Sequence, residues 1–187
     1  MKSNAPLSYR SVSDSKIELS ELMLPSHSNF SGKIHGGYLL SLMDQIAFAC
    51  ASKYSGHYCV TASVETVNFR MPIEVGELVS LKASVNFVGR SSMMVGIRVE
   101  AENIQTGQRK HCHSSYFTMV AKDAQGHTVE VPRLILEQPE EIRRYFKCMK
   151  MLAHKKQSTA ETPHFDPYTP AALELLREQG VRVDWNP

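Results

Sequence analysis

The chain has 187 residues and a net charge of +2; 42% of its residues are hydrophobic and 21% are charged. A domain of this length buries enough surface to fold without disulfides or a structural metal. No apolar stretch approaches the ~20 residues that a membrane-spanning helix needs. Basic and acidic residues are nearly balanced, at 21 against 19, whereas nucleic-acid binders usually carry a strongly basic face. We therefore expect neither a membrane nor a nucleic acid as a partner.

The cysteines and the first residues indicate the compartment. The four cysteines show no CxxC or other metal-ligand spacing. They are Cys50, Cys59, Cys112 and Cys148. Residues 1–6 lack the apolar segment of a secretory signal. For a chain with its own core, this combination predicts four free thiols in a reducing cytoplasm.

The first third of the chain predicts one strand and one helix. Residues 1 to about 15 are rich in serine and have no periodicity, so we expect a flexible N-terminus. Residues 16–22 alternate polar and apolar, which is typical of a strand with one face on a core. A polar loop follows Pro25. The helix predicted from Tyr38 to Lys53 is apolar on nearly every side, as a helix buried within a domain is.

Four long strands are predicted next, because the hydrophobic period changes from helical to two. They cover about 58–71, 77–88, 92–103 and 109–122. Short turns separate them, and short connections imply antiparallel pairing. The sequence therefore predicts an α+β fold in which a long antiparallel sheet wraps around a central helix. Such a sheet has two open edges, so we expect at least a dimer.

The last part of the chain predicts a helical extension. One helix is expected from Glu140 to Ala153, followed by a linker over 157–168. Thr169 and Pro170 give an N-cap and first-turn signal for a final short helix that stops at Gly180. We expect these helices to dock on the sheet or on a neighbouring subunit. The predicted organisation is a flexible N-terminus 1–15, a domain 16–135 and a C-terminal helical extension 136–187.

Asp44 is the acid on the predicted central helix, and it shares a thin polar stripe with Ser41, Gln45 and Ser52. A carboxylate among apolar neighbours needs a partner or a solvated site. Two interpretations remain open: an ion pair with an arginine across an interface, or the general base or nucleophile of a hydrolase.

Gly36 and Gly37 precede the helix, where backbone N–H groups form an oxyanion-binding site if they are free. The seven residues from Gly37 to Asp44 span roughly 10 Å of helix axis, too far for both to act on one carbonyl. A site shared between two subunits removes this difficulty.

His111 and His113 stand two residues apart on a predicted strand, so they could share a face. No third ligand with recognisable spacing lies nearby, and zinc sites usually need three. We therefore predict ordinary strand histidines and no metal site. A serine triad is disfavoured as well, because the sequence contains no Gly-x-Ser-x-Gly motif.

One extended motif resembles a known family. The pattern Asn29-x-x-Gly32-x-x-His35-Gly36-Gly37-x-Leu39-Leu40-x-x-Met43-Asp44 resembles the signature of hotdog-fold acyl-CoA thioesterases. The likeness is greatest to the broad-specificity bacterial acyl-CoA hydrolases and the cytosolic long-chain acyl-CoA hydrolases of animals. Further matches are Val60-Thr61, Val67-Asn68-Phe69, Pro72, Gly76 and Val88-Gly89-Arg90-Ser91-Ser92, so the resemblance runs from about residue 16 to Arg133.

The resemblance implies a hotdog fold whose active unit is a homodimer with sites at its interface, commonly within a hexamer. It implies that Asp44 activates water or attacks the thioester, and that Asn29 positions water or substrate. The amides of Gly36 and Gly37 would polarise the carbonyl. The position of His35 varies among such enzymes, so its side chain is given no catalytic role. No cofactor is implied, because coenzyme A is part of the substrate and product.

Coenzyme A carries several phosphate charges, and the resemblance suggests where they bind. The turn Gly89-Arg90-Ser91-Ser92 offers a cation and two hydroxyls, which suit phosphate or ribose. Asn68 and Arg133 are further candidates.

Hydrolysis of acyl-CoA thioesters is thus the expected function. A hotdog hydratase would pair the helix acid with a histidine, whereas Ala49 stands five residues after Asp44. A non-catalytic acyl-CoA or nucleotide sensor on the same fold is the alternative. Asn29 and Asp44 together favour catalysis, since a pure binder needs neither in an apolar groove.

Overall fold

The computed structural model describes residues 8–160 and 169–179. The chain forms two compact units, one running to Met149 and the other starting at Lys150. The first unit holds the sheet, its central helix and the first turns of α3, and it is described first.

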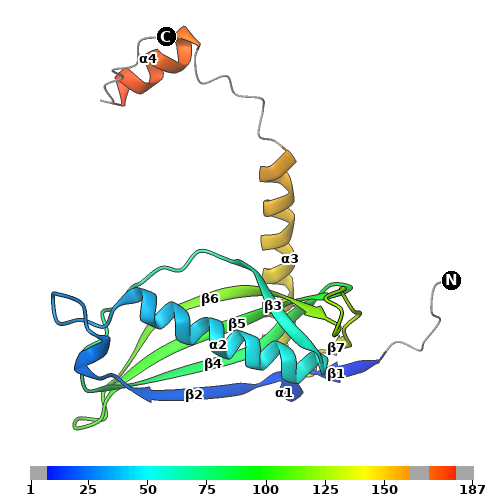
Figure 1. Cartoon of the computed structure of the whole chain (residues 1–187), viewed down its shortest axis with the longest axis horizontal. Helices are drawn as coiled ribbons and strands as arrows, with labels where there is room; N and C mark the ends of the chain where they lie inside the picture. The colour runs from blue at the N-terminus through cyan, green and yellow to red at the C-terminus, as the bar shows by residue number, and fades with distance from the viewer. Residues whose placement is uncertain (1–7, 161–168, 180–187) are drawn as a thin grey trace. The chain divides into compact units, whose positions relative to one another are not determined.

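The core of the first unit is a five-stranded antiparallel sheet (Figure 1). Its strands, in spatial order, are β2 (Ile17–Leu22), β4 (Glu77–Val88), β5 (Ser92–Asn103), β6 (Arg109–Lys122) and β3 (Tyr58–Val64). Each neighbouring pair is antiparallel. The predicted α+β fold with a long curled sheet is confirmed.

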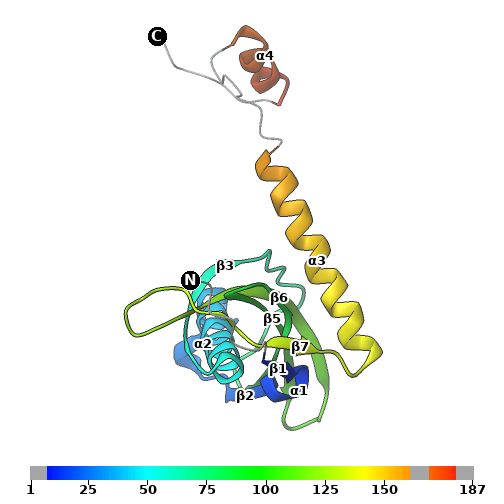
Figure 2. The same ribbon diagram turned by 90° about the vertical axis from the view of Figure 1, so that its right-hand side faces the viewer.

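The sheet curls around α2 (Gly36–Ser55), as the end-on view in Figure 2 shows. The helix starts and ends two residues outside the predicted bounds, and it stops at Gly56, whose φ of 73° is left-handed. Such a backbone is free of strain only for glycine. The buried residues of α2 join those of the sheet in one hydrophobic core.

The prediction that the central helix is buried nearly all round is wrong for one chain. Ser41, Asp44, Gln45 and Phe48 form an exposed stripe along α2. The stripe follows helical spacing, because residues three and four apart share a face. This stripe stays uncovered because the single sheet curls only part of the way around the helix.

The predicted flexible N-terminus is wrong for residues 9–15. Here β1 (Tyr9–Ser11) pairs in parallel with β7 (Arg133–Ile135), and α1 (Val12–Ser15) follows with Val12 and Ser15 buried. The hydroxyl of Ser15 donates to the Val12 carbonyl and accepts the amide of Val85. Serines with internal partners are stable when buried, and a search for apolar periodicity does not find them.

The predicted strand over 58–71 is too long. A bulge between Thr61 and Ser63 shifts the register, and β3 ends at Val64. Beyond it the chain still follows β6, since the Glu65 amide donates to the Tyr116 carbonyl (2.9 Å) and the Arg70 amide to the Cys112 carbonyl (3.2 Å). A short 3₁₀ turn, η1 (Pro25–His27), lies in the loop before α2.

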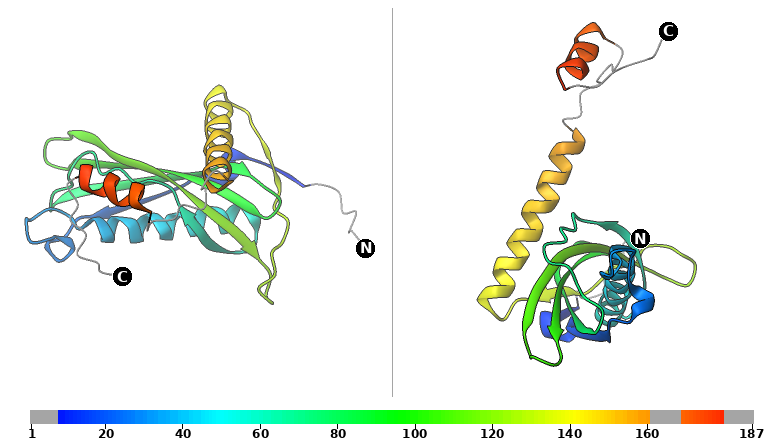
Figure 3. Two further views of the ribbon diagram at one scale, coloured as in Figure 1. Left: turned by 90° about the horizontal axis from the view of Figure 1, so that it is seen from above. Right: turned by 90° about the vertical axis from the view of Figure 1, so that its left-hand side faces the viewer.

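The outer face of the sheet carries the start of α3 (Pro139–Ala160), on the side opposite α2 (Figures 2 and 3). Tyr145 stacks at a tilt on Phe87 of β4, and Cys148 is fully buried. This docking on the sheet is the arrangement that we expected. The helix ends seven residues later than predicted, so residues 157–160 are helical; the rest of the predicted linker, 161–168, lies outside the described residues.

The second unit contains α4 (Pro170–Glu178). The hydroxyl of Thr169 accepts the amide of Ala172 at 3.2 Å, which confirms the predicted N-cap. The predicted stop at Gly180 lies outside the described residues. The predicted boundary between residues 135 and 136 stays a prediction.

All four cysteines are free, as predicted, and the structure shows that all four are buried. Burial raises the pKa of Cys50 and Cys148 to about 12, which makes both thiols unreactive. Within residues 8–160 and 169–179, no helix is long and apolar enough to cross a membrane.

Candidate active site

The Asp44 carboxylate is held by a hydroxyl from the neighbouring strand. Thr61 of β3 donates its Oγ1 hydrogen to Asp44 Oδ1 at 2.6 Å. The two residues meet because β3 packs beside α2 at the edge of the sheet. One carboxylate oxygen is thereby fixed, while the side chain stays exposed in a single chain. Asp44 forms no ion pair with an arginine in the described chain.

A cleft of about 320 Å³ lies in front of this carboxylate. It is lined by Asp44, Gln45, Phe48, Tyr58, Cys59, Val60 and Thr61. The rings of Phe48 and Tyr58 meet edge to face, 5.6 Å between centroids, and both are largely exposed. The cleft thus combines one carboxylate with an aromatic wall. This arrangement suits a reaction in which the carboxylate acts on a ligand with an apolar part.

The start of α2 is capped by a side chain, which changes the predicted oxyanion site. His35 is the N-cap, and its Nδ1 accepts the amide of Gly37 at 3.0 Å. The expectation that this amide is free is therefore wrong for the single chain. The Gly36 amide has no hydrogen-bond partner among the described residues. Gly36 is consequently the available donor, and Gly37 joins it only if the His35 ring moves.

An aromatic ring explains why position 36 is a glycine. A Cβ built there would lie 3.3 Å from the ring of Phe69, closer than most real contacts. Phe69 is half exposed and packs on the ring of His113, with 5.0 Å between centroids.

His113 is buried without a hydrogen bond. It is 1% exposed, and neither ring nitrogen has a partner within the described chain. Two effects lower the pKa of His113 to about 4: burial is the larger, and the electrostatic effect of the nearby His111 is the smaller. The ring is therefore neutral at physiological pH.

Asn29 lies in the loop before α2 and organises it. Its Oδ1 accepts hydrogen bonds from the amide (2.9 Å) and hydroxyl (2.7 Å) of Ser31 and from the amide of Lys33 (3.1 Å). These bonds occupy the side-chain oxygen, so the amide nitrogen is the group left for a ligand. This is a donor, which suits a carbonyl or a water oxygen.

Within one chain, the two halves of the predicted site lie apart. Neither Asn29, Gly36 nor Gly37 lines the cleft in front of Asp44. Asp44 lies near the middle of α2, where Thr61 of β3 contacts it, and the donor groups lie at or just before the start of the helix. The geometry therefore agrees with the axial separation worked out from the sequence.

Comparisons with known proteins agree with this architecture. The profile of the thioesterase superfamily matches residues 31–108. Protein VdlD of Helicobacter pylori is 42% identical over 135 residues, which are 72% of this chain and 77% of that protein. The uncharacterised acyl-CoA thioester hydrolase YkhA of Bacillus subtilis is 37% identical over 133 residues, 71% of this chain and 77% of YkhA. The chain belongs to the hotdog-fold acyl-CoA thioesterase family.

Solved structures of this thioesterase family are similar over most of the chain. An apo hexameric acyl-CoA thioesterase shares 34% identity with a TM-score of 0.80, covering 83% of this chain and 99% of that one. An acyl-CoA hydrolase of Staphylococcus aureus, solved with butyryl coenzyme A and coenzyme A, shares 28% identity and a TM-score of 0.76, covering 90% and 99%. Asn, Asp and Thr variants of the latter enzyme have also been solved; the substituted residues stand 15 and 17 positions apart.

Thr61 is the site residue that sequence reasoning missed in this thioesterase. It stood within a matched motif, but no role was assigned to it. The contact with Asp44 joins a helix to a strand 17 residues away, so no local periodicity reveals it. One signal could have indicated Thr61: it is a polar residue on the strand that directly follows the acid-bearing helix.

The predicted coenzyme A residues fall into two places. The guanidinium of Arg133 donates to the Gly89 carbonyl at 2.9 Å, so Arg133 joins the turn that presents the exposed Arg90. A Cβ at Gly89 would lie 2.6 Å from the Ser92 hydroxyl, so a larger residue there would require the Ser92 side chain to move. The Ala121 amide donates to the Ser91 carbonyl at 3.0 Å, which joins this turn to β6.

Asn68 lies far from this turn in one chain. Ser92 pairs with Val120, whereas the segment of Asn68 bonds to Cys112. Asn68 lies between Glu65, which bonds to Tyr116, and Arg70, which bonds to Cys112, so four to eight residues of β6 separate it from Val120; this is ~13–26 Å along a strand. The six candidates do not form one coenzyme A site within a single subunit.

The two strand histidines do not share a face. A bulge at Cys112 pairs His113 with Val99 and His111 with Glu100, which are adjacent and therefore point to opposite sides. His111 bonds to the Ser114 hydroxyl at 2.9 Å. In the described part of the chain, no group of three His, Cys, Asp or Glu residues lies close enough to hold a metal.

Proposed function

We propose that this chain hydrolyses acyl-CoA thioesters to a fatty acid and coenzyme A, at sites shared between two copies of the chain. The observation that carries the proposal is the hydrogen bond from Thr61 to Asp44 in front of an aromatic-walled cleft. Membership of the thioesterase family supplies the substrate class.

Asp44 acts as the general base or as the nucleophile. Thr61 holds one of its oxygens, so the other oxygen faces the reacting group. In the first route Asp44 takes a proton from water, the water oxygen bonds to the acyl carbon, and the carbon–sulfur bond breaks. In the second, Asp44 attacks the carbon and water then releases the acid. In both routes coenzyme A leaves as the thiolate and takes up a proton, so no cofactor is required.

The partner subunit supplies the donors. Its Gly36 amide binds the carbonyl oxygen as negative charge develops there, and the amide nitrogen of its Asn29 orients the water or the carbonyl. One such donor is worth about 2.7–4 kcal/mol of transition-state stabilisation. Gly37 contributes once the bond to His35 opens.

The spacing of known variants supports these assignments. Asn29, Asp44 and Thr61 stand 15 and 17 positions apart, as do the residues replaced in the S. aureus acyl-CoA hydrolase. The same three residue types recur in the same order.

The coenzyme A phosphates bind at the turn of Gly89, Arg90, Ser91 and Ser92, where Arg90 is exposed. Asn68 of the other subunit completes this contact. Phe48 of α2 and Tyr58 of edge strand β3 are both exposed at this edge of the sheet, where a second copy continues the sheet. By analogy with the hexameric relative we propose a homohexamer of such dimers. Four buried free thiols support a cytoplasmic location.

A thiol-release assay with short, medium and long acyl-CoAs tests this function. Wild-type protein releases thiol, and Asp44→Asn, which keeps the shape of the side chain, loses about 100- to 10,000-fold in kcat. Glu102→Gln is the matched control, since this acid pairs with Arg109 on the sheet away from α2. Saturable acyl-CoA binding without thiol release by the wild type would contradict hydrolysis and indicate a sensor.

A further inference from the structure

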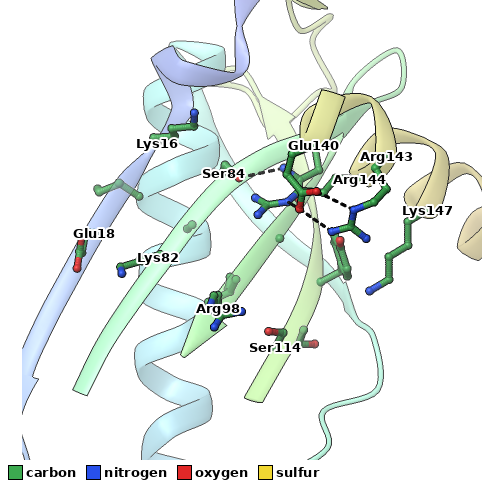
Figure 4. A pocket seen from close by; sticks show the side chains of 17 residues that line it. Lys16, Glu18, Lys82, Ser84, Arg98, Ser114, Glu140, Arg143, Arg144 and Lys147 are labelled. Carbon is green, nitrogen blue, oxygen red and sulfur yellow. Dashed lines mark hydrogen bonds and ion pairs between the residues drawn. The ribbon is translucent and has the colours of Figure 1, made fainter. Parts of the chain in front are cut away.

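A second cavity, of about 560 Å³, lies on the outer face of the sheet beside the first turns of α3 (Figure 4). This volume is within the ~300–1,000 Å³ typical of small-molecule sites. Neither Asp44 nor Thr61 lines it, nor does the turn around Arg90. The contact of Tyr145 with Phe87 fixes α3 against the sheet beside it. The proposed hydrolysis leaves this cavity unused.

Basic side chains from four segments of the chain converge on this cavity. They are Lys16, Lys82, Arg98, Arg143, Arg144 and Lys147. Lys16 follows α1, Lys82 and Arg98 come from β4 and β5, and the rest come from α3. Because residues far apart in sequence contribute, the cluster is a product of the fold and not a local run of charge.

On the α3 side of the cavity, two arginines donate hydrogen bonds to one carboxylate. Glu140 accepts from Arg143 through Nε at 2.7 Å and from Arg144 through Nε at 2.9 Å. These bonds lower the pKa of Glu140 to about 2, so it stays ionised. Two guanidinium groups share one negative charge here, which leaves excess positive charge.

The sheet side repeats this arrangement. Glu100 accepts from Lys82 Nζ at 2.9 Å and from Arg98 Nε at 2.8 Å. Figure 4 shows Lys82 and Arg98 on the strands, apart from the group of Glu140, Arg143 and Arg144 on the helix. The cavity therefore has two separate basic clusters, each only half neutralised.

The remaining charges do not cancel this excess. Lys16 pairs with Glu141 at 3.4 Å, and Lys147 lies 5.1 Å from the centre of the Tyr116 ring. Glu18 is the other acid that lines the cavity. Six basic groups thus face four acids in and around it.

The floor between the two clusters is polar but also accommodates an organic group. Asn86 is buried and donates through Nδ2 to the Ser84 hydroxyl at 2.9 Å. A Cβ at Gly96 would come within 2.2 Å of Asn86 Oδ1, so glycine is needed beside it. The Tyr116 ring supplies apolar surface.

We propose that this cavity binds an organic anion with a diphosphate group, which lies between the α3 arginines and the pair Lys82 and Arg98. Guanidinium groups match phosphate oxygens in a bidentate geometry, and the two clusters match two anionic groups. The shared chemistry is a nucleoside diphosphate, whose base rests on Tyr116. It has two possible sources: a free nucleotide, or the nucleotide end of coenzyme A, which would then lie in this cavity and not at the turn of Arg90.

Direct binding to the full-length protein tests the proposal. Inorganic pyrophosphate and ADP are titrated calorimetrically at low salt into wild type, Arg143→Gln/Arg144→Gln and Lys82→Gln/Arg98→Gln. Saturable binding is expected in the wild type and a loss of about tenfold or more in each double variant. Arg109→Gln is the matched control, because this exposed strand arginine pairs with Glu102 outside the cavity; its affinity should change less than twofold.

Steady-state kinetics with the same variants separate the two sources. If KM for acyl-CoA rises while kcat is unchanged, the cavity holds the nucleotide end of the substrate, an outcome that rests on the proposed hydrolysis. If KM is unchanged while ADP binding is lost, the ligand is a free nucleotide. The proposal is overturned if wild type binds neither pyrophosphate nor ADP, or if both double variants bind them as wild type does. Wild-type hydrolysis, measured in the same preparation, reports separately on the proposed function.

Discussion

The two faces of the sheet use the same strands for opposite purposes. Along β4, Leu81 and Ala83 point into the core, while Lys82 and Ser84 point outward to the second cavity. The inner face is apolar around α2, and the candidate site lies at its edge, where Thr61 of β3 donates to the exposed carboxylate of Asp44. The outer face distributes many charges over a wide area. Alternation along a strand keeps the two faces apart, so substitutions on one face should leave the other unaffected.

The largest effect is expected from separating the two halves of the inner site. Asn29→Asp keeps the oxygen that organises the loop but removes the NH₂ donor, and Asp44→Asn removes the base. Each variant alone should lose about 100-fold or more in kcat. Subunits of the two kinds, mixed by co-expression, should regain about one quarter of wild-type activity, because half of the dimers then hold one intact site. The thiol-release assay measures this.

Recovery of that kind requires that Asn29 and Asp44 act from different subunits. Mixed Asp44→Asn and Thr61→Val subunits are the control, since both changes fall on the same half and should not restore activity in this way. If the first mixture stays as inactive as its components, the shared site is wrong.

The buried histidine of the inner face should make the protein sensitive to acid. The pKa of His113 is lowered to about 4, so only the unfolded chain binds this proton between pH 6.5 and 4. The contribution of neutral His113 to the free energy of unfolding is complete above pH 6.5. It is lost as the pH falls, by up to about 1.4 kcal/mol per pH unit and about 3 kcal/mol in all. The free energy of unfolding, measured with denaturant, should therefore fall less between pH 7 and 5 in His113→Phe than in the wild type.

His57→Gln is the control for this measurement, because His57 is exposed and its replacement should not alter the pH profile. An unchanged acid sensitivity in His113→Phe would show that other groups cause it.

A smaller effect is expected from Thr61. Thr61→Val keeps the shape of the side chain but removes the donor to Asp44 (2.6 Å). Loss of this charge-assisted hydrogen bond should lower kcat about 10- to 100-fold. Thr61→Ser retains the hydroxyl and should stay within a few-fold of wild type. Equal kcat values for the valine and serine variants would remove Thr61 from the mechanism.

The smallest effect is expected on the outer face. Glu100→Gln removes the acceptor of Lys82 and Arg98, whose hydrogen bonds lower the Glu100 pKa to about 2. The bonds of Glu100 with Lys82 and Arg98 contribute stability above pH 4.5 that is lost as the pH falls toward 2. The pair is partly exposed, so the free energy of unfolding should change by about 1 kcal/mol or less, with kcat unchanged. A large loss of kcat would show that the outer face affects the reaction, which contradicts the independence of the two faces.

Much of the fold could be predicted from patterns within short windows. The alternation in β4, β5 and β6 and the long apolar helix gave the curled sheet and its direction of pairing. Asp44 and the two glycines were found because an acid on an apolar helix and glycines at a helix start are local signals. Asn29 was found only through the family resemblance. The resemblance then gave them a common purpose.

Tertiary structure decided what depends on distant residues. It placed the Thr61 hydroxyl on Asp44, the His35 ring on the Gly37 amide, and residues 9–15 against the core. It also gathered the basic side chains of α3, β4 and β5 around one cavity. None of these contacts has a sequence period, because each joins elements whose spacing along the chain is set by loops and not by helix or strand geometry.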